Sequence, residues 1–240
     1  MELNILHIYP DCMSLYGEWA NVAVLTRMLE AMGAKVNIRR LLLDETPDFS
    51  DADFLYLGAG TERTQKAALT ALKDHVPALR EALDRGAVAL FTGNAMEILG
   101  KSVTDQQGKV WPGLGLAEFT TVETDRRDPE DVIAHSPLWD APVVGFMNKC
   151  STTAGVDKPL FDRLSLGFGN DRMGGPEGYV DGSLYATHIT GPVLVKNPDV
   201  LAHMARRLFE AKGWPLPEPM PELPHQRAGY DVTLRELSAR

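Results

Sequence analysis

The stretch Ala87–Gly100, AVALFTGNAMEILG, decides how this chain folds. Its first five residues are apolar without a helical period, which is typical of a strand buried on both faces of a parallel sheet. Thr92-Gly93-Asn94 interrupts the run, and Ala95–Leu99 predicts the start of a helix. Open α/β sheets hold a nucleophile or a ligand at such a turn, because free backbone N–H groups converge at the carboxyl end of the strand. We therefore expect any functional site at this turn.

The first half of the chain alternates between apolar runs and helical periodicity, which predicts an α/β fold with a doubly wound, mostly parallel sheet. Strands are expected at Leu3–Tyr9, Lys35–Leu41 and Phe54–Leu57, and helices at Glu18–Met32 and Arg63–Arg85, the second with a break near Pro77. Gly58-Ala59-Gly60-Thr61 follows the third strand. Small residues there allow close approach of a ligand to backbone N–H groups, although any strand-to-helix junction has the same appearance.

After residue 100 the sequence changes to short segments in which apolar and polar residues alternate, separated by glycine and proline. This pattern predicts added antiparallel strands. These segments are Leu116–Thr124, Val132–His135, Val143–Met147, Leu164–Phe168 and Ser183–Ile189. The six glycines between Gly167 and Gly182 indicate a long loop. A helix is expected over Pro198–Lys212. We interpret residues 1–212 as one domain and residues 213–240 as a proline-rich tail, with a short helix expected over Tyr230–Arg240.

Composition excludes several classes of function. The chain of 240 residues has a net charge of −9 and no clustered basic face, which argues against a nucleic-acid partner. No apolar run approaches the roughly 20 residues of a membrane span, and no basic region precedes an apolar one at the N-terminus, so we expect a cytoplasmic protein without a membrane span. Cys12 and Cys150 form neither a disulfide framework nor a metal-binding spacing. We interpret both as small buried hydrophobes and expect no metal or cofactor.

Short motifs in a fixed order make the chain resemble a known family over residues 3–212. They are Tyr9-Pro10-Asp11, Leu15-Tyr16-Gly17 with Asn21, Gly58-Ala59-Gly60, Ile98-Leu99-Gly100-Lys101, Gly113-Leu114-Gly115-Leu116, Gly167-Phe168-Gly169-Asn170, Glu177-Gly178, and Gly191-Pro192-Val193-Leu194 with Lys196-Asn197-Pro198. The chain resembles the class I glutamine amidotransferases of the cobyric acid synthase-type branch, and most of all the glutaminase subunits of lipid II isoglutaminyl synthases. The resemblance implies a flavodoxin-like open sheet flanked by helices, a role in peptidoglycan amidation and a Mur ligase-like or other synthetase partner.

The two catalytic positions of that family are substituted. In that family the nucleophile elbow, the turn that carries the catalytic cysteine, reads Cys-Gly-Gly-Tyr-Gln before Leu-Leu-Gly. In the same alignment Gly93 takes the place of the cysteine and Glu97 takes the place of the glutamine. The family's basic histidine precedes Gly-Pro, where this chain has Thr190. Glutamine hydrolysis by this class requires a thiolate and a base, so the resemblance predicts a chain without glutaminase activity.

Other residues of this region are candidates for a pocket or for altered chemistry. His188 shares a strand face with Thr190, Asn94 and Glu97 are polar at the elbow, and Cys12 follows the first strand at the same sheet edge. Each also has a purely structural interpretation. His188 is then a hydrogen-bonded core histidine, Asn94 and Glu97 only fill space, and Cys12 is a thiol with no paired base. Thr92 is interpreted as packing. Arg127 lies near a family arginine that assists substrate recognition, within a hydrophilic stretch, Asp125–Pro129, that is also expected as a solvated loop.

Three hypotheses follow. The first is a non-catalytic subunit that binds and regulates a synthetase. The second is an enzyme with altered hydrolase or transferase chemistry that uses Glu97, His188 or Cys12. The third is a sensor that binds glutamine or glutamate, or another small amide or amino-acid ligand, without turnover.

Overall fold

The computed structural model describes all 240 residues and contains two sheets. The larger sheet has six strands in the order β10-β11-β4-β3-β1-β2. All neighbours pair in parallel except β10 with β11, so the expected mostly parallel, open sheet is confirmed. Its strands are β1 (Glu2–Ile8), β2 (Lys35–Leu41), β3 (Phe54–Leu57), β4 (Val88–Thr92), β10 (Tyr179–Asp181) and β11 (Leu184–Thr187).

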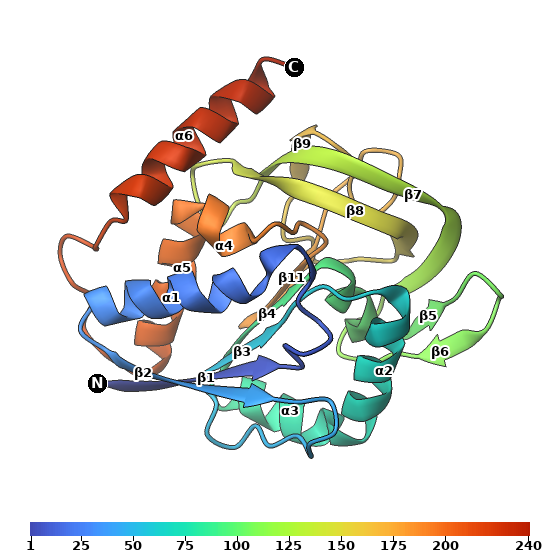
Figure 1. Ribbon diagram of the computed structural model, residues 1–240, viewed down its shortest axis with the longest axis horizontal. Coiled ribbons are helices and arrows are strands. Elements are labelled where there is room, and N and C mark those ends of the chain that lie inside the picture. Colours follow the sequence, from blue (N-terminus) through green and yellow to red (C-terminus); the bar gives the residue numbers. More distant parts are fainter.

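Helices cover both faces of this sheet (Figure 1). Helices α1 (Trp19–Ala31), α4 (Val193–Lys196) and α5 (Pro198–Ala211) pack on one face, and α2 (Glu62–Leu72) and α3 (Val76–Asp84) pack on the other. A short 3-10 turn, Lys73–His75, separates α2 from α3, as the proline at position 77 predicts. The sheet therefore lies between two layers of helices.

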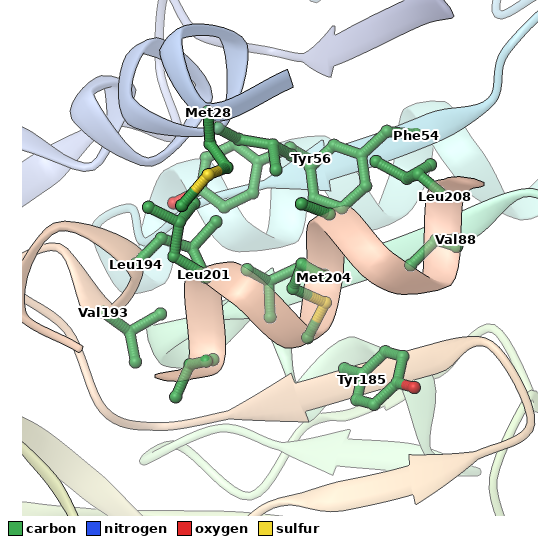
Figure 2. Close-up of a cluster of buried hydrophobic side chains, with 14 of the residues drawn as sticks. Met28, Phe54, Tyr56, Val88, Tyr185, Val193, Leu194, Leu201, Met204 and Leu208 are labelled. Atoms are coloured by element: carbon green, nitrogen blue, oxygen red, sulfur yellow. The ribbon is translucent and has the colours of Figure 1, made fainter. Parts of the chain in front are cut away.

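Strand β3 is apolar at every position, and β4 at all but Thr92, because alternate residues enter two different cores. Phe54 and Tyr56 of β3 belong to the core under α1 and α5, whereas Leu55 and Leu57 belong to the core under α2 and α3. Figure 2 shows the first of these cores, where α5 and α1 pack against β3, β4 and β11. Full burial of one such side chain stabilises the fold by about 1.5–3 kcal/mol relative to exposure.

The second sheet holds most of the antiparallel pairs, and here the predicted strand lengths were wrong. The segment expected as an added antiparallel strand at Ser183–Ile189 instead forms β11, which pairs in parallel with β4 in the first sheet. It consists of β5 (Ser102–Thr104), β6 (Val110–Pro112), β7 (Thr120–His135), β8 (Val143–Ala154) and β9 (Arg163–Leu166), with only β5 and β7 parallel. The segments expected as two short strands and a loop at Asp125–Pro129 form the single strand β7. Pairing with β8 carries the chain through this hydrophilic stretch, with a shift of register between Glu123 and Asp128.

The helix expected at Ala95–Leu99 is also corrected. Two 3-10 turns, Gly93–Ala95 and Glu97–Leu99, end at Gly100 without an α-helix. The carbonyls of Ile98 and Leu99 accept hydrogen bonds from the backbone N–H groups of residues 114, 116 and 117, so they are not available to a further helical turn. The chain therefore turns directly into β5.

The C-terminal residues form the helix α6 (Pro224–Ser238), which begins before the expected start at Tyr230. It contacts β7 and β8, and the hydroxyl of the buried Tyr230 donates to the carbonyl of Pro142 at 2.7 Å. The division of the chain at residue 212 stays a prediction. None of the helices combines the length and the apolar character that crossing a bilayer requires.

Candidate functional site

The turn after β4 leaves no room for a side chain at position 93. Gly93 has a φ of +62°, in the left-handed region that favours glycine. A Cβ atom there would lie 2.6 Å from the Cβ of Ala59 and 3.0 Å from the Cγ2 of Thr190. Carbon atoms make favourable contacts at about 3.5–4.0 Å, so both neighbours close the space. The elbow is thus occupied from two sides, by the turn after β3 and by the loop after β11.

Asn94 fixes the elbow to the turn after β3. Its Oδ1 accepts from the backbone N–H of Gly60 at 2.9 Å, and its Nδ2 donates to the carbonyl of Gly60 at 2.9 Å. The side-chain amide of Gln65 on α2 donates to the carbonyl of Asn94 at 2.6 Å. Thr61 caps α2 by accepting from the backbone N–H of Thr64. These bonds hold the carboxyl ends of β3 and β4 together.

A cavity of about 180 Å³ opens at this edge of the sheet. Nine of the residues selected from the sequence line it: Ala59, Gly60, Thr61, Gly93, Asn94, Glu97, Arg127, His188 and Thr190. Gly58 and Cys12 do not. Gly58 packs beneath the turn, where a Cβ would lie 2.8 Å from the carbonyl oxygen of Met13. Sequence reasoning missed the lining residues of β8, among them Lys149 and Ser151, because no motif lies near them in the chain.

Glu97 contacts side chains from three other parts of the chain. Its Oε2 accepts from Gln65 Nε2 at 2.6 Å, and its Oε1 accepts from Ser151 Oγ at 2.5 Å. The Nε2 atom of His188 lies 3.8 Å from the same Oε1. The side chain is buried. Glu97 thus joins α2, the elbow, β8 and the end of β11.

His188 follows β11 and is held by Glu177. Its backbone N–H donates to Glu177 Oε1 at 2.7 Å, and its ring Nδ1 lies 3.0 Å from the same oxygen. Thr187 Oγ1 donates to Glu177 Oε2 at 2.6 Å. Burial lowers the pKa of His188, which favours the neutral ring. His188 and Thr190 both face the cavity, as their spacing predicts.

Ion pairs neutralise most of the remaining charge. Arg127 pairs with Glu62, and the buried Lys66 pairs with the buried Glu123. The ammonium group of Lys149 donates to the carbonyls of Gly169 and Asn170 at 2.8 and 2.7 Å, and burial lowers its pKa to about 8. No group of three or more His, Cys, Asp or Glu side chains is placed to hold a metal ion.

Neither cysteine replaces the missing side chain at the elbow. Cys12 lies outside the cavity and is partly exposed, and burial of its thiol raises the pKa to about 11. Cys150 lines the cavity on β8, where burial raises its pKa to about 12 and its Sγ donates to Glu62 Oε1 at 3.2 Å. The reactive form of cysteine is the thiolate, and the raised pKa values keep both groups mainly as thiols near neutral pH.

The open, mostly parallel sheet flanked by helices has the fold of the class I glutamine amidotransferases. A solved glutamine amidotransferase structure superposes with a TM-score of 0.55 at 14% identity, covering 87% of this chain and 98% of that chain. A glutamine amidotransferase from Thermotoga maritima gives 0.52 at 12% identity, with coverage of 99% and 92%. These likenesses show the fold.

The chain belongs to the CobB/CobQ-like glutamine amidotransferase domain family, which matches residues 4–198. Two similar proteins are GatD subunits of lipid II isoglutaminyl synthase (glutamine-hydrolyzing). The Staphylococcus aureus protein is 28% identical over 214 residues, which cover 89% of this chain and 87% of that protein. The Streptococcus pneumoniae protein is 28% identical, with coverage of 86% and 79%.

Proposed function

We propose that this chain is a cytoplasmic, non-catalytic glutamine amidotransferase-like subunit that binds a Mur ligase-like or other synthetase and influences that partner's active site. Two similar proteins are subunits of a synthase that amidates lipid II, which supports a synthetase as the partner class and peptidoglycan as the pathway. The family match over most of the chain supports the same kind of subunit.

The observation that carries the loss of glutaminase activity is the filled space at Gly93. Splitting an amide by this class needs a nucleophilic side chain at the elbow and a base that activates it. Here position 93 has no side chain, and the methyl groups of Ala59 and Thr190 occupy the space that one would need. In a serine protease, removing the nucleophile and base lowers turnover about 10⁶-fold. We expect a loss of similar size.

The cavity itself supports a retained ligand function. Glu97, His188 and Lys149 still converge on an open volume of about 180 Å³, and Asn94 keeps the turn after β3 in place. We include in the proposal that this cavity holds a small amide or amino-acid ligand without turnover. Cys12 takes no part, since it lies outside the cavity. Altered chemistry by Glu97 and His188 is the competing hypothesis.

The proposal is tested by measuring ammonia release from glutamine. The purified chain is assayed alone and with the Mur ligase-like synthetase of the same organism, and the Staphylococcus aureus relative with its own partner serves as the positive control. We expect release at least about 10⁴-fold below that control, unchanged by His188→Ala. Ammonia release comparable to the control and abolished by His188→Ala would overturn the proposal.

The partner is tested separately by co-expression with the same synthetase. We expect the two chains to co-elute at a fixed stoichiometry in size-exclusion chromatography, and the synthetase's amidation rate with free ammonium to change when the chain is added. Separate elution together with an unchanged rate contradicts the subunit role.

A further inference from the structure

Glu97 and His188 both line the cavity, and they place two buried hydrogen-bond acceptors 3.8 Å apart. The Nδ1 atom of His188 faces Glu177 Oε1, which also accepts from the backbone N–H of His188, so the ring donates through Nδ1. In the neutral ring the Nε2 atom is then an acceptor. It is buried without a hydrogen-bond partner, and it lies 3.8 Å from Glu97 Oε1. Two acceptors this close repel each other unless a donor lies between them.

A single nitrogen atom can bridge this pair. A donor nitrogen about 2.8 Å from each acceptor satisfies both across a 3.8 Å separation. Ser151 and Gln65 already donate to Glu97, and neither of them has a hydrogen bond to His188 Nε2. A ligand bound in the cavity can supply this donor. Its group needs at least two N–H bonds, as a primary ammonium or a primary amide has.

Charge selects between these two groups. Glu62 and Glu123 have their own cations, Arg127 and Lys66. Lys149 interacts electrostatically with Glu97 and Glu177, but its hydrogen bonds go to the carbonyls of Gly169 and Asn170 and it forms no ion pair with Glu97. Glu97 therefore has no directly paired cation, unlike Glu62 and Glu123. A positively charged donor gains a charge-assisted hydrogen bond that a neutral amide does not.

We propose that Glu97 and His188 form a subsite for a primary ammonium group on a small ligand. The inference deepens the retained ligand function proposed above and rests on it. It also assigns a role to the carboxylate at position 97, which lies where the family that the chain resembles has a glutamine. The ammonium group donates to Glu97 Oε1 and His188 Nε2, and the remainder of the ligand extends along the cavity towards Asn94.

The test compares three probes of similar length that differ in one functional group: n-butylammonium, butyramide and butyrate. Each is titrated into the full chain while the ¹⁵N signals of the His188 ring and the backbone amide of Ser151 are followed by NMR. We expect n-butylammonium to bind at least tenfold more tightly than either other probe and to move the His188 Nε2 signal. Butyrate or butyramide binding as tightly as n-butylammonium, or no change of the His188 signals with any probe, overturns the proposal.

Glu97→Gln removes the charge and keeps the shape, so Gln65 and Ser151 retain a hydrogen-bonding partner. We expect this variant to weaken n-butylammonium binding tenfold or more. Glu62→Gln is the matched control, because that carboxylate lines the same cavity but is paired with Arg127. Equal weakening by both variants would show a diffuse negative potential and refute a subsite. Neither result bears on ammonia release from glutamine, so the two proposals fail separately.

Discussion

Gly93→Ala tests directly whether the elbow can accept a side chain. Alanine at a φ of +62° pays the cost of the left-handed conformation, roughly 1–2 kcal/mol. Its methyl group would also lie 2.6 Å from the Cβ of Ala59, and overpacking of this kind costs about 1–3 kcal/mol. We therefore expect the free energy of unfolding to fall by about 2–5 kcal/mol, a large part of the total stability of a typical domain.

Two further variants separate the two contributions. Gly115 has nearly the same φ, +61°, but a Cβ there meets nothing within 4 Å, so Gly115→Ala reports the conformational cost alone. Ala59→Gly removes the methyl group that crowds position 93. In a double-mutant cycle we expect Gly93→Ala and Ala59→Gly to couple favourably by about 1–3 kcal/mol, because the second change relieves the clash created by the first.

The assay is urea-induced unfolding followed by far-UV circular dichroism, with the thermal midpoint as a second measurement. For a chain of this size each kcal/mol lowers the midpoint by about 2–4 °C. The reasoning is refuted if Gly93→Ala costs no more than Gly115→Ala and shows no coupling to Ala59→Gly. The elbow would then have room for a side chain, and only the absence of one at Gly93 would remain to account for a loss of glutaminase chemistry.

Two other predictions concern buried charge. Burial lowers the pKa of His7 from about 6.5 to about 4. Below pH 6.5 the unfolded chain therefore binds more protons than the folded chain, and the free energy of unfolding falls towards pH 4. For this group the loss is about 3 kcal/mol. His7→Phe is expected to flatten the pH dependence of urea unfolding between those values, and an unchanged slope contradicts this. Lys66→Met leaves Glu123 buried without its cation and is expected to cost about 3–5 kcal/mol in the same assay, with most of the loss recovered by adding Glu123→Leu. A double variant as unstable as the single one would refute the pairing argument.

The local pattern of residues was sufficient for strands β1 to β4 of the central sheet and for the helices that pack on them, but not for β10 or for the parallel pairing of β11 with β4. Unbroken apolar runs indicate strands buried on both faces, and helical spacing with Gly33 behind it predicted α1 to within a residue or two at each end. The positions of Gly93 and Thr190 at the elbow and beside it also follow from sequence order, because the carboxyl ends of parallel strands meet at one edge of the sheet. These features depend on neighbours a few residues apart, which the sequence displays directly.

The contents of the site depended on the tertiary structure. Ser151 reaches Glu97 across 54 residues of chain, and this contact exists only because β8 pairs with β7 through a hydrophilic stretch that by itself has no strand pattern. The approach of Glu97 to His188 depends likewise on pairing between β4 and β11. The pairing and register of the strands set the hydrogen-bond partners and the crowding distances, so the packed structure determined what the site can hold. The order of residues in the chain had already determined where the site lies.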